Sequence, residues 1–150
     1  MVGTTRAGHF AHPFLDGTCE DTLQNIARIF ITCRAQSDIT PAQMVVLSAK
    51  GLRTSALLQE RTLAGVTLKR FMGTFDGSGS AVGTEGDLVA DTIARFKGRS
   101  APVAILAELD FSTLDNHTRR LLFTGITRAL WRLECVMSAA VEKLLMDTLT

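Results

Sequence analysis

The clearest structural signal in the sequence is the apolar run at residues 102–109, PVAILAEL. Such a run is typical of a strand that is buried on both faces, as the strands of parallel sheets are. A shorter run of the same kind, MVVL, lies at 44–47. Segments with helical spacing of apolar residues separate the expected strands, and this alternation predicts an α/β domain with a mainly parallel sheet.

Capping residues and periodicity predict the other elements. Thr18 with Asp21, and Ser112 with Asp115, have the spacing of a capping box, which marks the start of a helix. The predicted helices are 18–33, 52–63, 114–129 and 139–149, and the further predicted strands are 66–71, 88–94 and 133–137.

The chain has 150 residues, which suits a single domain. Residues 1–17 show no periodicity and are expected to be an irregular lead-in to a domain over 18–150. The five glycines within 73–86 predict a flexible loop inside that domain.

Charge and composition limit the possible partners. Lys and Arg total 16 against 15 Asp and Glu, so any contact with nucleic acid must come from a local patch of cations. No signal peptide and no run of about 18 apolar residues occurs, so we expect a soluble, cytoplasmic protein with no membrane partner. The scattered Cys19, Cys33 and Cys135 predict buried, reduced thiols, and no metal site is expected.

One candidate site lies in the segment 119–138, RRLLFTGITRALWRLECVMS. Its pattern predicts an amphipathic helix that presents Thr127-Arg128-Ala129 near its carboxyl end, followed by a strand. An arginine there offers a planar, permanently charged fork that suits the charge on a transferring γ-phosphoryl group. A surface arginine favoured by the helix dipole is the alternative on chemistry alone.

A second candidate lies in 92–109, where Phe96-Lys97-Gly98 predicts a tight turn before the buried strand. Glycine allows a backbone to approach a ligand closely, and a neighbouring lysine can hold a phosphate. A plain turn is the alternative.

Together these two segments resemble motifs V and VI of the superfamily 1 helicases of the UvrD/Rep/PcrA type, in the same order. The first resembles motif V through Thr92 and the Lys97-Gly98 turn before an apolar strand. Residues 39–58 resemble the strand-and-helix unit that these helicases carry earlier in the same domain. The motif VI core is matched by Leu122, Phe123, Thr127, Arg128 and Ala129.

The resemblance implies a second RecA-like motor domain, a three-layer domain of the P-loop NTPase type. In the family, ATP lies between two such domains, and Arg128 would act as the catalytic arginine finger. Gly98 and Ser100 would lie near the nucleotide, and Thr92 and Lys97 would contact DNA. The implied partners are single-stranded DNA and the N-terminal motor domain, in the same or another chain.

The chain also departs from the family pattern. Motif V usually reads Lys-Gly-Leu-Glu, whereas Arg99 and Ser100 follow the glycine here, and Ala94 replaces a usual histidine. No Gly-x-x-x-x-Gly-Lys-Thr/Ser phosphate loop occurs in the 150 residues, and 108–110 does not form the Asp-Glu pair that would hold magnesium. ATP and Mg²⁺ are therefore expected only in the complete helicase, and this chain alone is expected to be inactive.

Two other hypotheses remain open. The chain is either a portion of a helicase, or a free-standing, degenerate relative that binds DNA or protein without catalysis, or an unrelated small α/β enzyme. Trp131 can stack on a base, but its apolar neighbours Leu130 and Leu133 favour a place in the core.

Overall fold

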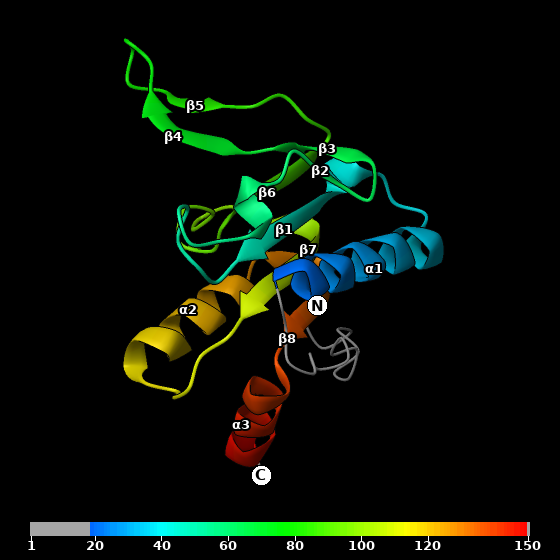
Figure 1. Ribbon diagram of the computed structural model, residues 1–150, viewed down its shortest axis with the longest axis vertical. Coiled ribbons are helices and arrows are strands. Elements are labelled where there is room, and N and C mark those ends of the chain that lie inside the picture. The colour runs from blue at the N-terminus through cyan, green and yellow to red at the C-terminus, as the bar shows by residue number, and fades with distance from the viewer. Residues whose placement is uncertain (1–18, 150) are drawn as a thin grey trace.

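A six-stranded sheet forms the centre of the structure, a computed structural model that describes residues 19–149 (Figure 1). The strand order is β2-β3-β6-β1-β7-β8, and all neighbouring strands are parallel except the β2–β3 pair. The predicted mainly parallel α/β fold is therefore confirmed. The strands are β1 (Met44–Ser48), β2 (Thr62–Leu63), β3 (Val66–Lys69), β6 (Leu88–Thr92), β7 (Ala101–Leu109) and β8 (Ala129–Met137).

Helices cover both faces of this sheet, because its central strands are apolar on both sides. Met44 and Val46 of β1 pack in one cluster with α1 (Cys19–Ser37). Val45 and Leu47 of the same strand pack in the other cluster, with Leu122 of α2 (Asn116–Ile126) and Val141 of α3 (Ala139–Leu149). The alternation produces three layers. No helix among residues 19–149 is long and apolar enough to cross a membrane.

The helix boundaries differ slightly from the predicted ones. The helix α1 continues to Ser37 and is followed by Asp38, which has a φ of 49°. The helix α2 begins after Asp115, whose side chain accepts a hydrogen bond of 2.8 Å from the backbone N–H of Thr118. The predicted Ser112–Asp115 capping box is therefore wrong, because Asp115 itself is the N-cap. The predicted lead-in 1–17 and the cap at Thr18 lie outside the described residues.

The predicted helix over 52–63 is wrong. This segment contains turns, the 3-10 helix η3 (Leu57–Gln59) and the short strand β2. Its backbone is held instead by a residue far along the chain: Ala56 donates its N–H to the carboxylate of Glu108 at 2.9 Å, and Ser55 donates its hydroxyl to the same group. A long-range contact of this kind overrides local helix propensity.

The predicted flexible loop over 73–86 contains a β-hairpin. The strands β4 (Phe71–Phe75) and β5 (Ala81–Gly83) pair antiparallel and extend away from the main sheet (Figure 1). Asp76 organises the turn between them, because its Oδ1 accepts the N–H groups of Ser78 at 2.9 Å and Ser80 at 3.0 Å. Hydrogen bonds from Ser78 and Ser80 hold the pKa of Asp76 below its usual value.

The burial predicted for Trp131 and for the cysteines can be compared with the structure. Trp131 is 49% exposed, so its predicted place in the core is wrong. It lies near the start of β8, the edge strand of the described sheet, where Leu130 is also exposed. Cys33 is fully buried, and burial raises the pKa of its thiol to about 11. Cys33 and Cys135 are both free thiols.

Candidate functional site at the carboxyl edge of the sheet

The carboxyl ends of three parallel strands meet at one edge of the sheet. Ser48, the last residue of β1, is in register with Thr92, the last residue of β6, and with Ala107 of β7. The loops 49–56 and 93–100 leave the sheet from this edge. In open α/β sheets this edge is where ligands bind.

Thr92 begins a closed turn that carries the segment compared with motif V. Its hydroxyl accepts the N–H of Arg95 at 3.1 Å, and its carbonyl accepts the N–H of Phe96 at 3.1 Å. Gly98 has a φ of 84°, in the left-handed region that favours glycine, and the N–H of Arg99 bonds back to Phe96 at 3.0 Å. The turn is therefore held by its own backbone together with the Thr92 hydroxyl.

The predicted residues of this turn differ in exposure. Thr92 is only 7% exposed, and its hydroxyl already caps the turn, so its direct role is to shape the turn. Phe96 is buried beneath the turn, whereas Lys97, Gly98 and Ser100 are exposed. Lys97 is an exposed cation of the turn, beside Arg95, which is paired with Asp91, and Arg99, which lies over the Phe96 ring.

Arg128 connects this turn to the end of α2. Its Nη1 donates to the carbonyl of Arg99 at 3.0 Å, its Nε donates to the carbonyl of Thr124 at 2.9 Å, and its Nη2 donates to the hydroxyl of Thr127 at 2.9 Å. The Arg128 carbonyl accepts the N–H of Ala101 at 2.9 Å. The structure thus brings the predicted residues of the two segments together. These bonds use three of the five N–H donors of a guanidinium and leave the charge without an acidic partner within the described residues.

Close packing of α2 on the sheet sets the position of Arg128. A Cβ at Gly125 would lie 3.0 Å and 3.1 Å from the two Cδ atoms of Leu106, and 3.2 Å from Cδ1 of Ile93. A larger residue at this position would require the buried side chains of Leu106 and Ile93 to shift by a few tenths of an ångström. The end of α2, and with it the guanidinium, is therefore placed by a contact in the core.

Arg95 also belongs to the site, although no sequence motif pointed to it. Its Nε lies 3.3 Å from Oδ1 of Asp91, the buried residue before Thr92. Its guanidinium carbon lies 3.5 Å from the centre of the Phe71 ring on the hairpin. A cation over an aromatic face is attracted by the ring, so Arg95 links the motif V turn to β4.

Glu108 is a second residue that sequence reasoning did not place. It lies near the end of β7, is 5% exposed, and has a φ of 58°. Its Oε1 accepts the hydroxyls of Ser48, at 2.8 Å, and of Ser55, and its Oε2 accepts the N–H of Ala56. A glutamate inside an apolar strand was the only signal. These bonds occupy the carboxylate and hold the loop after β1.

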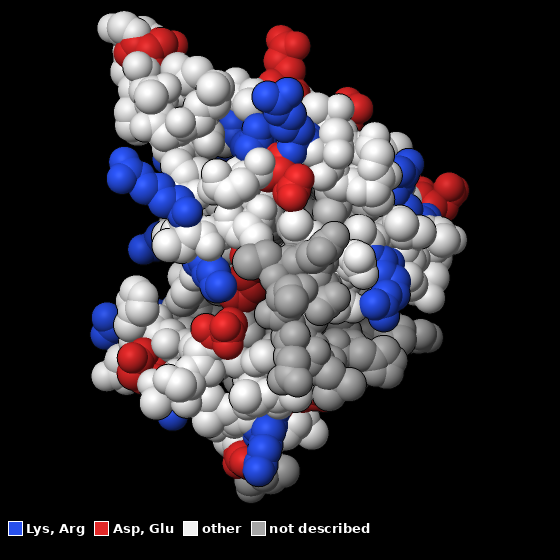
Figure 2. All heavy atoms as spheres, in the orientation of Figure 1, with Lys and Arg blue, Asp and Glu red and all other residues white. Residues whose placement is uncertain are grey.

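Cations and acids share the surface near this edge. Lys and Arg side chains follow one side of the molecule in Figure 2, the side on which the loops after β1 and β6 lie in Figure 1, and several Asp and Glu side chains lie among them. Within the described part of the chain, no group of three or more His, Cys, Asp and Glu side chains is arranged to hold a metal ion.

The chain is similar to known helicase domains in part of its sequence and in its fold. Residues 87–133, which include both the turn and Arg128, match the family model of the UvrD-like helicase C-terminal domain. The fold is similar to the C-terminal domain of a possible DNA helicase from Lactobacillus plantarum WCFS1, with a TM-score of 0.54 and 16% identity over 88% of this chain and 76% of that chain. No curated protein matches the sequence significantly. The chain is therefore similar to the UvrD-like helicase C-terminal domain in sequence over residues 87–133, and to the C-terminal domain of a possible DNA helicase in fold.

Proposed function

We propose that this chain is the C-terminal motor-domain portion of an ATP-dependent superfamily 1 DNA helicase. In this proposal Arg128 is the arginine finger, Gly98 and Ser100 border the nucleotide, and Lys97 contacts single-stranded DNA across the turn shaped by Thr92. An N-terminal motor domain, in the same or another chain, supplies the phosphate loop and the magnesium ligands. Because the proposed substrate is cellular DNA, the proposal also places the protein inside the cell.

The bond between Arg128 and the Arg99 carbonyl is the observation that carries this proposal. It joins the end of α2 to the turn that bears Gly98 and Ser100, so a ligand that touches one of them lies near the other. The guanidinium is oriented before any ligand arrives, and two of its N–H donors are left for an anion. Orientation of this kind is what stabilisation of a developing charge requires.

The described residues fit one side of an ATP site. Bound ATP would supply the γ-phosphoryl group, and Arg128 would balance its charge. The carboxylate of Glu108 is buried and bonded to three donors, so it is not free to hold Mg²⁺. The magnesium ligands are therefore assigned to the partner domain.

The bonds of Arg128 also support a second candidate, a free-standing helicase-like domain that binds DNA without catalysis. All three bonds are to groups of this chain, so the guanidinium has a structural role whether or not ATP is present. The two candidates differ in whether Arg128 acts on a nucleotide.

ATP hydrolysis in the presence of single-stranded DNA separates these candidates. The chain alone, and its Arg128→Ala variant, are expected to give no turnover. When the chain is added to a first motor domain that carries a phosphate loop, we expect turnover from the native chain and a loss of about a thousandfold in Arg128→Lys. Circular dichroism checks that this variant is folded.

Each other outcome has a definite meaning. Turnover by the chain alone that Arg128→Ala abolishes would contradict the proposed division of the ATP site between two domains. Equal turnover by the native chain and Arg128→Lys in the mixture would show that Arg128 does not act as an arginine finger. DNA binding with no turnover in the mixture would favour the non-catalytic domain.

A further inference from the structure

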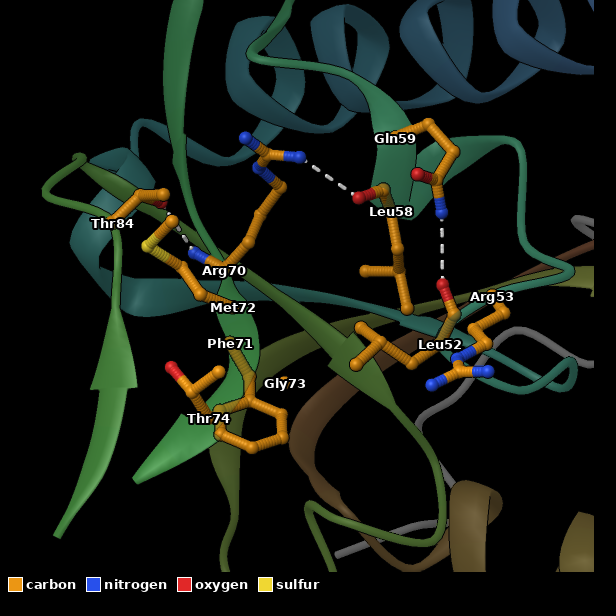
Figure 3. A pocket seen from close by; sticks show the side chains of 10 residues that line it. All are labelled: Leu52, Arg53, Leu58, Gln59, Arg70, Phe71, Met72, Gly73, Thr74 and Thr84. Atoms are coloured by element: carbon orange, nitrogen blue, oxygen red, sulfur yellow. Dashed lines mark hydrogen bonds between the residues drawn. The ribbon is translucent and has the colours of Figure 1, made fainter. Parts of the chain in front are cut away.

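A groove of about 600 Å³ lies between the β4–β5 hairpin and the segment 52–59 (Figure 3). Its volume is within the range of pockets that hold small organic groups, roughly 300–1,000 Å³. The walls come from two segments that the sequence did not place correctly, which is why no motif pointed to the groove. Residues that matter for its chemistry are Leu52, Arg53, Arg70, Phe71, Met72 and Thr84.

The charged groups that line this groove are both cations. Arg53 is exposed, and its side chain makes no hydrogen bond or ion pair within the described residues. Arg70 donates from Nη1 to the carbonyl of Leu58 at 2.9 Å, while its buried Nε has no acceptor. No Asp or Glu lines the groove. The Arg53 guanidinium is exposed and unpaired within the described residues, so an oxygen-rich anion is the ligand that it favours.

Apolar side chains form part of the groove wall, beside the polar side chains of Gln59, Thr74 and Thr84. In Figure 3 the Phe71 ring and the Leu52 side chain lie on opposite sides of the groove, and the Arg53 guanidinium lies beside Leu52. Met72 adds a further apolar side chain and is 61% exposed. The ligand therefore needs a flat or apolar part next to its anion, as a nucleotide has.

Arg95 fixes the position of this groove relative to the motif V turn. It lies 3.5 Å from the centre of the Phe71 ring and 3.3 Å from Asp91, the residue before Thr92. The wall of the groove is thus one contact away from the turn that bears Lys97.

We propose that this groove binds one nucleotide unit of single-stranded DNA, an extension of the DNA contact proposed for Lys97 and dependent on it. Arg53 meets the phosphate, and the base lies between Phe71 and Leu52. Backbone charge and an apolar wall recognise any base, so the contact is independent of sequence. Arg53 and Lys97 lie in the loops after β1 and β6, neighbouring parallel strands that end at one edge, and this placement favours an extended single strand over a free phosphate or a nucleotide in solution.

Fluorescence anisotropy of a labelled oligothymidylate with the full chain tests this proposal. We expect Arg53→Ala to weaken binding about tenfold, since it removes a charged contact and no bond within the described residues. Arg28→Ala removes the same charge from the exposed face of α1 and is the matched control, with no expected change. Lys97→Ala reports on the motif V turn separately.

The outcomes distinguish the groove from the wider function. If Lys97→Ala binds DNA more weakly while Arg53→Ala binds like the native chain, the proposed DNA contact in the groove is overturned. The proposed DNA contact at the motif V turn then remains. No binding by the native chain overturns both. Phe71→Leu tests the base: affinity for oligothymidylate is expected to fall while affinity for an abasic oligonucleotide of equal length stays unchanged. Equal losses on both oligonucleotides overturn the assignment of Phe71.

Discussion

Arg128 and Glu108 are side chains of opposite charge type, and neither forms an ion pair within residues 19–149. The guanidinium of Arg128 bonds to two backbone carbonyls and a hydroxyl, and the carboxylate of Glu108 bonds to two hydroxyls and one backbone N–H. Hydrogen bonds to an ion fix its orientation without cancelling its charge. For Arg128 this leaves a charge that a ligand can use, whereas Glu108 is buried and serves the loop after β1.

Replacement of Glu108 by glutamine is expected to destabilise the chain by about 1–3 kcal/mol. Glutamine has the same shape, but it has one acceptor oxygen in place of two and no charge, so the hydroxyl of Ser48 or Ser55, or the N–H of Ala56, loses its acceptor. Urea unfolding followed by circular dichroism measures the change in the free energy of unfolding.

Glu85→Gln is the control for this prediction, because Glu85 is exposed on the approach to β6. It is expected to change the free energy of unfolding by less than about 0.5 kcal/mol. Equal stabilities of the native chain and Glu108→Gln would mean that the carboxylate does not hold the loop.

The sequence predicted single residues well where local chemistry decides their place. The Phe96-Lys97-Gly98 turn was predicted correctly because a glycine just before a buried strand is typical of a turn, and Gly98 does adopt the positive φ that favours glycine. Trp131 was misplaced because its exposure depends on β8 being the edge strand, which is a property of the whole sheet. The role of Glu108 depends on Ser48 and Ser55, which lie 60 and 53 residues away.

At the level of elements, the position of α2 depends on Gly125. Alanine within a helix is usually more stable than glycine by about 1 kcal/mol. At this position the added Cβ meets Leu106 and Ile93 at 3.0–3.2 Å, so we expect Gly125→Ala to destabilise the chain instead, by about 1–3 kcal/mol. The sign of the change, measured by urea unfolding, is the diagnostic result.

His117→Ala is the control for this prediction, because His117 is exposed near the start of the same helix. Its effect is expected to stay within about 0.5 kcal/mol. If Gly125→Ala stabilised the chain as helix propensity alone predicts, the packing of α2 on β7 would be looser than described.

The elements that the sequence predicted are those with a strong local pattern. The strands β1, β6 and β7 and the helices α1 and α3 follow from apolar runs and helical spacing. The segment 52–59 and the hairpin were missed, because the first is held by Glu108 and the second has short strands that each contain a glycine. Both missed segments line the proposed groove, so the part of the site that depends on them was not predictable from local pattern.

For the whole molecule, the net charge of +1 means that nucleic acid affinity must come from where the cations lie. The exposed Lys97 and Arg53 belong to the loops after β6 and β1, neighbouring parallel strands that end at one edge. A single strand that follows this edge meets both cations. Removal of either one should therefore change the same binding event.

Salt dependence tests this single path along the edge. Each phosphate contact contributes about 0.7 to the slope of log K against log salt for single-stranded DNA. We expect Lys97→Ala and Arg53→Ala each to lower the magnitude of that slope by about 0.7, the double variant to lower it by about 1.4, and Arg28→Ala to leave it unchanged. Anisotropy titrations at several salt concentrations give the slopes. If both cations contact the same bound strand, their effects on the slope add in the double variant. A double variant whose slope equals that of either single variant would therefore mean that one strand does not contact both cations.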